Sequence, residues 1–269
     1  MAFAASLAFT LGSPRVALGQ TRDLRWDPAV DGTVTGVGAA VWLTSVLSQA
    51  ELAPARCRWC EVDGVDRSAR EALLWSHPAT AGTMSNVTAF VVAPVAAVGL
   101  DWLAAAHDGS AGNIGVDTLL VLESVVIVAN VNQLTKLLVG RERPFVHALP
   151  ADQKAQTPNP SDNNLSFFSG HTSEAAALAA SAGTVATLRG YRWAPLVWGV
   201  GGALAVTTGY LRIAADAHWL TDVLVGMLVG AGIGVGVPAL FHRPEPLAAT
   251  TSAGLTLPPV RGASFSFAW

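Results

Sequence analysis

The sequence contains, at residues 211–241, the stretch LRIAADAHWLTDVLVGMLVGAGIGVGVPALF. Its first part carries an arginine, two aspartates and a histidine, and the run from Val223 to Leu240 has no charged residue. An apolar run of about 20 residues is long enough to cross the hydrocarbon core of a membrane as a helix. The stretch therefore predicts a membrane-spanning helix with a group of titratable side chains at one end.

The composition of the whole chain also favours a membrane protein. Of its 269 residues, 51% are hydrophobic and 13% are charged, and the mean hydropathy is +0.43. Ordinary soluble domains have about 25% charged residues. The net charge of -3 comes without a run of basic residues, so the sequence predicts no nucleic-acid partner.

Long apolar segments recur along the chain and predict an all-α fold of six helices. The segments are residues 34–52, 87–106, 116–138, 172–188, 193–211 and 219–241. We expect one helical domain over residues 34–241, between an N-terminal extension at 1–33 and a tail at 242–269 that forms a short strand or a frayed end. The extension contains an apolar stretch followed by Ala17-Leu18-Gly19, so a cleaved signal peptide and an ordinary extension are both open.

Charged residues between the apolar segments predict how the helices cross a bacterial-type membrane. Arg189 and Arg192 lie between the fourth and fifth segments, and His242 and Arg243 follow the last one. Positive residues gather on the cytoplasmic side of a membrane. The opposite ends of these helices are therefore expected to face the periplasm or the outer leaflet.

The two cysteines, Cys57 and Cys60, lie in a polar stretch. A zinc site would need two further ligands at fitting spacing, and none is recognisable. We expect a plain thiol pair or a small disulfide, the latter if this stretch faces an oxidising compartment.

The first of three polar clusters is KLLVGRERP at residues 136–144. Lys136 precedes Arg143 by two helical turns, so the two cations are expected on a similar face near a helix end, where Pro144 predicts a stop. Taken alone, the pair is also explained by charged side chains that reach the membrane interface.

The second cluster is SFFSGHTSEAAALAA at residues 166–180. Ser169, Gly170 and His171 open an alanine-rich helix, whose N-terminal N–H groups and dipole favour an anion. His171 stands where a proton can be delivered to a leaving oxygen. Ser169 or Thr172 also fits the simpler role of a helix N-cap.

The third cluster lies in the stretch quoted first. His218 and Asp222 are four residues apart, so on one helix the carboxylate can accept a ring N–H and orient the imidazole. Arg212 supplies a planar fork for a phosphate or carboxylate group. Asp216 is expected to be a turn residue rather than a catalyst.

All three clusters are expected at the same end of the predicted bundle. Titratable residues at membrane depth are costly and mark sites and pathways. Three cations, a helix N-terminus and two histidines together indicate a phosphate site with a nucleophile and an acid.

At these residues the sequence resembles the type 2 phosphatidic acid phosphatase superfamily, which includes bacterial non-specific acid phosphatases and vanadium haloperoxidases. The family pattern is K-x6-RP, then PSGH, then SR-x5-H-x3-D. The chain fits it at every position except two, where Phe168 replaces a proline and Leu211 replaces a serine. The resemblance implies a six-helix membrane-embedded bundle.

The resemblance also implies a role for each matching residue. His218 would attack phosphorus to form a phosphohistidine, Asp222 would hold its ring, and His171 would protonate the leaving alcohol and then activate water. The phosphate-binding residues would be Lys136, Arg143, Ser169, the Gly170 backbone and Arg212. No metal and no other cofactor is implied.

We expect a lipid phosphatase whose substrate is a phospholipid phosphate or a polyprenyl phosphate or pyrophosphate. Two alternatives remain, a secreted soluble acid phosphatase and a non-catalytic membrane protein that binds phosphate lipids. A phosphotransferase would share the motif residues and differ only in its acceptor, and a vanadate-dependent peroxidase would share the anion pocket. Activity toward lipid and soluble phosphate esters separates the leading prediction from the first two.

Overall fold

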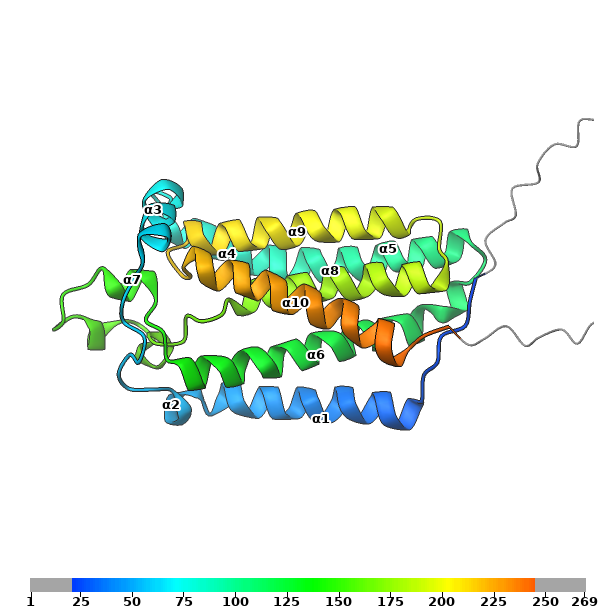
Figure 1. Cartoon of the computed structure of the whole chain (residues 1–269), viewed down its shortest axis with the longest axis horizontal. Coiled ribbons are helices and arrows are strands. Elements are labelled where there is room, and N and C mark those ends of the chain that lie inside the picture. The colour runs from blue at the N-terminus through cyan, green and yellow to red at the C-terminus, as the bar shows by residue number, and fades with distance from the viewer. Residues whose placement is uncertain (1–20, 245–269) are drawn as a thin grey trace, which may run out of the picture.

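Long helices run side by side along the molecule in the computed structural model, which describes residues 21–244 (Figure 1). The long helices are α1 (Pro28–Leu47), α4 (Pro78–Val87), α5 (Ala93–His107), α6 (Ile114–Val139), α8 (Gly170–Arg189), α9 (Ala194–Ala214) and α10 (Leu220–Phe241). A π-helical turn, η1 (Thr88–Val92), joins α4 to α5. The described residues contain isolated bridges but no strand, so the predicted all-α fold is confirmed.

Short elements lie outside the long helices. They are α2 (Gln49–Leu52), α3 (Gly64–Leu73), α7 (Pro144–His147) and the 3-10 turns η2 (Ala111–Asn113), η3 (Lys154–Gln156) and η4 (Pro160–Asp162). All of them except η2 gather at one end of the bundle, and both ends of the described chain lie at the other end (Figure 1). The predicted signal peptide and most of the predicted tail fall outside the described residues.

Two helices begin earlier than the apolar segments predict. The first begins at Pro28 rather than residue 34, because the Asp27 side chain accepts hydrogen bonds from two backbone N–H groups of its first turn. The second begins at Pro78 rather than residue 87. Its first part is rich in threonine, serine and asparagine, so a search for apolar runs does not recognise it.

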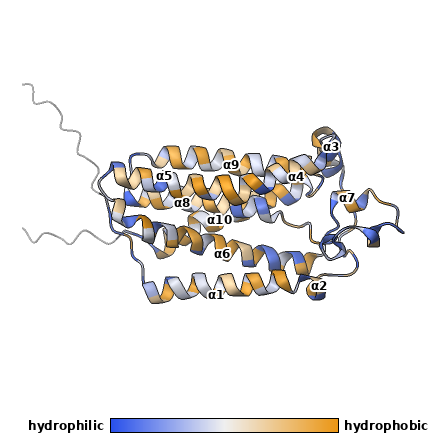
Figure 2. Cartoon of the chain, turned by 180° about the vertical axis from the view of Figure 1, so that it is seen from behind, coloured by the Kyte–Doolittle hydropathy of each residue, from blue (hydrophilic) through white to orange (hydrophobic). Residues whose placement is uncertain are grey.

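Five of the helical rods are long and apolar enough to cross a membrane, and the chain is a multi-pass membrane protein. Figure 2 shows apolar residues along their whole length. Leu228 of α10 is 73% exposed, as expected of a side chain that faces lipid. The sixth rod, α8, is surrounded by the others and most of its residues are buried. Because α8 has little surface facing lipid, it can consist largely of alanine, serine and threonine.

Glycines let α10 approach α8 closely. They recur at every fourth position on one face of α10, at Gly226, Gly230 and Gly234. A Cβ atom on Gly234 would lie 2.6 Å from the Ala177 carbonyl oxygen, and one on Gly230 would overlap the Ser173 carbonyl oxygen. Small residues that bring two backbones together are a common means of packing helices in membranes. This packing sets the start of α8 beside the start of α10.

Gly230→Ala is expected to lower the unfolding temperature in detergent, because the new methyl group pushes α8 away from α10. Overpacking of this kind costs about 1–3 kcal/mol. Gly232→Ala is the matched control, since nothing lies within 4 Å of its Cβ position and alanine favours a helix. Equal losses in the two variants, measured by circular dichroism during heating, would contradict this account of the packing.

Candidate active site

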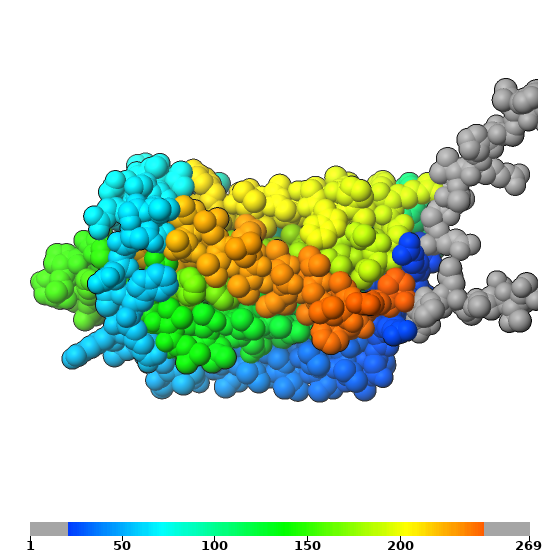
Figure 3. Space-filling view, viewed as in Figure 1, coloured from blue at the N-terminus to red at the C-terminus, as the bar shows by residue number. Residues whose placement is uncertain are grey.

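The structure brings the three sequence clusters together at one end of the bundle. They come from the last turns of α6 and α9, the starts of α8 and α10, and the segments just before α7 and α10. The predicted site residues at these places are Lys136, Arg143, Ser169, Gly170, His171, Arg212, His218 and Asp222. The segment that includes α3 lies over part of this end of the molecule, beside the loops around α7 (Figure 3).

His218 is buried and its ring has one defined hydrogen-bonding arrangement. Its Nδ1 lies 2.8 Å from the Ser166 carbonyl oxygen. A carbonyl oxygen can only accept, so Nδ1 carries the hydrogen and Nε2 keeps its lone pair. That lone pair faces Arg143, whose Nη1 is 3.2 Å away. Burial and the neighbouring cations, first of all Arg143, lower the pKa of His218 well below its usual value.

Asp222 acts on His218 differently from the direct contact that the spacing of four residues predicts. The distance from His218 Nδ1 to Asp222 Oδ2 is 3.6 Å, which is too long for a hydrogen bond. The carboxylate instead accepts hydrogen bonds from the Ser166 hydroxyl and, at 3.0 Å, from the Trp219 backbone N–H. Asp222 therefore holds Ser166, whose carbonyl holds the imidazole.

Arg143 is placed by a turn and not by helical spacing from Lys136. The helix ends at Val139, and Gly140 adopts a left-handed conformation with φ of 60°, so the prediction that two helical turns align these cations is wrong. Arg143 donates from Nη1 to the Ala217 carbonyl oxygen at 2.8 Å and from Nη2 to Asp162 Oδ1 at 2.8 Å. These bonds fix the guanidinium against His218.

Lys136 lies beside the N-terminus of α8. A Cβ atom on Gly170 would be 3.2 Å from Lys136 Nζ and 2.9 Å from Asn132 Oδ1, so only glycine leaves room for these groups. Ser169 occupies the N-cap position without a capping hydrogen bond from its side chain. Its hydroxyl lies 2.9 Å from that of Thr172. The first N–H groups of α8 and the Lys136 ammonium thus face the same small region.

Arg212 is buried with part of its hydrogen-bonding capacity unused. Its Nη1 donates to the Ser85 hydroxyl at 3.1 Å, and its Nε has no partner. Among residues 21–244, neither Arg212 nor Lys136 forms an ion pair with a carboxylate. Buried charges are normally paired. Two unpaired cations beside a helix N-terminus therefore fit an anion such as phosphate.

His171 lies at the start of α8, on the side of α4 and η1. Its Nε2 is 2.8 Å from Asn86 Oδ1, and its ring packs on that of Phe90 with centroids 4.6 Å apart. Sequence reasoning did not find these two neighbours, because Asn86 and Phe90 are about 80 positions away and belong to no recognisable motif.

Arg141 is a buried residue beside the candidate site that the sequence clusters did not single out. It is 1% exposed and stacks on Trp59, with the guanidinium carbon 4.0 Å from the ring centroid. Its Nη1 donates to Asp222 and its Nη2 donates to Asp66 of α3. It lies between Gly140 and Arg143 but is not part of the recognised pattern. Its role depends on Asp66, which no local pattern identifies.

Asp216, expected to be a turn residue, lies in the turn after α9 with φ of 58°. Its carboxylate accepts two hydrogen bonds from the Arg70 guanidinium, from Nε at 2.6 Å and from Nη2 at 2.7 Å. The pair ties α3 to the loop that carries His218. The pKa of Arg70 is raised, chiefly by its hydrogen bond to Asp216.

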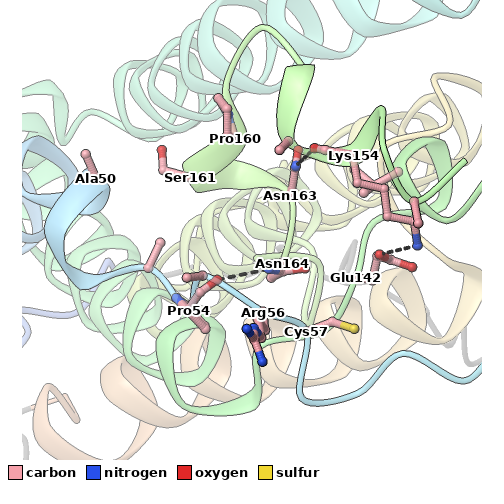
Figure 4. Close-up of a pocket in the computed structure, with 15 residues that line it drawn as sticks. Ala50, Pro54, Arg56, Cys57, Glu142, Lys154, Pro160, Ser161, Asn163 and Asn164 are labelled. Atoms are coloured by element: carbon pink, nitrogen blue, oxygen red, sulfur yellow. Dashed lines mark hydrogen bonds and ion pairs between the residues drawn. The ribbon is translucent and has the colours of Figure 1, made fainter. Parts of the chain in front are cut away.

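A cavity of about 530 Å³ lies in the loops at this end of the molecule, but none of the eight predicted site residues lines it. Figure 4 shows bonds between residues that line it, among them those from Lys154 to Glu142 at 2.8 Å and from Asn164 to the Pro54 carbonyl oxygen at 2.9 Å. Another lining residue, Cys57, forms a disulfide with Cys60. These bonds stabilise the loops that surround the anion site.

Arg141→Lys is expected to lower the unfolding temperature in detergent, because a single ammonium group cannot bridge Asp66 and Asp222 as the planar fork does. Breaking a buried ion pair costs about 3–5 kcal/mol. Arg67→Lys, at an exposed position of α3, is the matched control and should leave thermal unfolding unchanged. A variant at residue 141 that unfolds like the wild type would show that the bridge contributes nothing.

Of three comparisons with known proteins, the family match agrees with the motifs. A search of curated proteins found no match. A search of solved structures found the crystal structure of the first transmembrane PAP2 type phosphatidylglycerolphosphate phosphatase from Bacillus subtilis, at 18% identity and a TM-score of 0.48, covering 75% of this chain and 94% of that one. The model of the PAP2 superfamily matches residues 117–245. This match supports the predicted family over residues 117–245, the region that contains all eight candidate site residues.

Proposed function

We propose that the chain is a metal-independent phosphatase that hydrolyses the phosphate or pyrophosphate monoester of a lipid through a phosphohistidine. The observation that carries this proposal is the buried His218 ring, whose Nε2 lone pair faces Arg143 and whose other near cations are Lys136 and Arg212. A neutral buried imidazole among cations is suited to attack a phosphate group.

In the first step, His218 Nε2 forms a bond to phosphorus while the ester P–O bond breaks. Lys136, Arg143 and Arg212, together with the N–H groups at the start of α8, stabilise the charge on the phosphoryl oxygens. These protein cations supply the positive charge that a metal ion supplies in other phosphoryl-transfer sites. His171, as the imidazolium, gives its proton to the leaving alkoxide, which departs as the alcohol.

In the second step, neutral His171 takes a proton from water as that water attacks the phosphohistidine. The P–N bond breaks, inorganic phosphate leaves, and His218 regains its neutral form. In the structure, His171 Nε2 contacts Asn86. To act as the acid, the ring must either turn so that Nε2 faces the leaving group or present Nδ1 to the leaving group. Asn86 is thus proposed to hold the ring between turnovers.

A lipid substrate is supported by the surroundings of His171. Phe90 packs on the His171 ring and is itself 54% exposed on the apolar outside of the bundle. The neighbouring Val91 is 55% exposed on that surface. The leaving-group side of the site is therefore next to the lipid-facing surface, where the tail of a phospholipid or polyprenyl phosphate would lie.

We further infer that the site faces the periplasm or the outer leaflet. The Cys57–Cys60 disulfide is at the site end of the molecule, and disulfides persist in oxidising compartments. Arg189 and Arg192 lie at the opposite end, where the positive-inside rule predicts the cytoplasm.

The purified full-length protein is expected to release inorganic phosphate from lipid phosphates in the presence of EDTA. His218→Asn should abolish turnover, and His171→Asn should lower kcat by about 10² to 10⁴ because general acid catalysis is lost. Labelling with phosphorus-32 substrate and an alkaline quench should trap an acid-labile phosphoenzyme in His171→Asn but not in His218→Asn. His107→Asn, at the other end of the bundle, is the matched control and should keep wild-type turnover.

The choice of substrates separates the alternatives. Phosphatidic acid, phosphatidylglycerolphosphate and a polyprenyl pyrophosphate are compared with a small aryl phosphate. Equal turnover of the soluble ester would favour a non-specific acid phosphatase. Binding of lipid phosphate with no turnover of any substrate would favour the non-catalytic membrane protein and overturn the proposal.

The orientation is tested by labelling single cysteines in intact cells with a membrane-impermeant maleimide. Cys57 and Cys60 are first replaced by serine. Ala151→Cys, exposed at the site end, is expected to react, and Ala111→Cys, exposed at the other end, is expected to react only after lysis. The reverse pattern would place the site in the cytoplasm.

A further inference from the structure

We propose that Asp31, Glu123 and His242 bind a divalent cation of the Zn²⁺ class, at the end of the bundle opposite His218. The three residues come from α1, from α6 and from the segment just after α10. One potential ligand atom from each lies within 4.8 Å of the other two. All three residues are buried, with exposed fractions of 5%, 6% and 3%. This inference does not depend on the proposed phosphatase activity.

The hydrogen bonds of His242 leave its Nε2 ready to bind a cation. Its Nδ1 lies 3.0 Å from the Arg25 carbonyl oxygen, which can only accept, so the hydrogen is on Nδ1. Nε2 lies 3.1 Å from Glu123 Oε2. This short contact needs a positive charge between the two atoms, either a proton on Nε2 or a metal ion that both atoms bind. Histidines that ligate metals commonly donate their other ring N–H to a backbone carbonyl in this way.

The two buried carboxylates of this cluster carry two negative charges, and a single proton on His242 would balance only one of them. Asp31 and Glu123 are both buried, and in the described part of the chain no lysine or arginine forms an ion pair with either. The Asp31 carboxylate has a backbone partner, the Asp27 N–H at 2.7 Å. A proton on His242 balances one of the two negative charges, whereas a divalent cation balances both.

The donor set and its surroundings fit a cation with a mixed preference for nitrogen and oxygen. One imidazole and two carboxylates are typical ligands of Zn²⁺, which takes a water as the fourth ligand where a position is open. A cavity of about 580 Å³ is lined by all three residues and by neighbours that include Trp26 and Val30. It supplies both a route for the ion and space for that water.

The proposed role of the cation is to fasten α1 to the bundle. This helix packs along α6 at the side of the molecule (Figure 1), and most of its surface is exposed. Glu123 is 13 residues from Lys136 on α6, which corresponds to about 20 Å along a helix. The cation is therefore too far from His218 to take part in phosphate chemistry. Chelation is expected to loosen α1 while turnover persists below the unfolding temperature.

The test uses full-length protein without a histidine tag, purified in detergent, stripped with EDTA and exchanged into chelator-free buffer. Zn²⁺ is then added and the unbound excess is removed. Elemental mass spectrometry is expected to find one bound Zn²⁺ ion per chain. The unfolding temperature should rise by about 5 to 10 °C at Zn²⁺ near 100 times Kd. Both effects should be lost in His242→Gln and Glu123→Gln.

Two control variants make the test specific. His107→Gln lies near the same end of the bundle but outside the cluster, and His218→Asn removes a histidine from the anion site. Both should bind Zn²⁺ as the wild type does. X-ray absorption of the wild-type protein should find one nitrogen from histidine among oxygen ligands, which tests the site even if a glutamine variant fails to fold.

Three outcomes would overturn the proposal. The first is that the wild-type protein retains no Zn²⁺. The second is that His242→Gln retains as much as the wild type. The third is an unfolding temperature that responds to pH but not to Zn²⁺, which would mean that a proton on His242 bridges to Glu123.

Discussion

The buried guanidinium of Arg141 is the interaction on which the geometry of the anion site depends. It joins Asp66 of α3 to Asp222 of α10. Asp222 in turn holds the Ser166 hydroxyl, and the Ser166 carbonyl sets which ring nitrogen of His218 carries the hydrogen. A planar fork can satisfy two carboxylates at once, whereas either carboxylate alone would be an uncompensated buried charge. The loops outside the bundle are thus connected to the reactive nitrogen by a continuous series of polar contacts.

The geometry of the site also depends on the close packing of the α8 and α10 backbones. The glycines of α10 allow α8 to lie against it, so that the Ser169 N–H donates to the Asp222 carbonyl oxygen at 3.0 Å. The start of α8, with its unpaired N–H groups, is therefore beside the His218 loop. Because the other helices shield α8 from lipid, this helix can keep the small and polar residues that the packing and the site require.

The buried charges at the two ends of the bundle have opposite signs. At the site end, Lys136 and Arg212 form no ion pair with a carboxylate among residues 21–244, which leaves positive charge available for an anion. At the other end, Asp31 and Glu123 leave an excess of negative charge beside a single histidine. A second polar group near that end, Asp117, is instead fully satisfied by Arg189 and Tyr191. Burial and the nearby Asp117 carboxylate raise the pKa of Tyr191, so its hydroxyl stays protonated. This contrast supports the proposals of an anion at one cluster and a cation at the other.

The sequence by itself determined the all-α class, the six apolar segments, the family and the eight candidate site residues, because apolar run length and motif spacing are local properties of a chain. It did not predict that Ser166 rather than Asp222 contacts the His218 ring, that Asp162 and Ala217 hold the Arg143 guanidinium, or that Asn86 and Phe90 surround His171. It also gave no sign of the Asp66–Arg141 bridge or of the cluster around His242. Only the tertiary structure decided these points, because each depends on contacts between residues far apart in sequence, whose approach is set by how the helices pack and not by any local pattern.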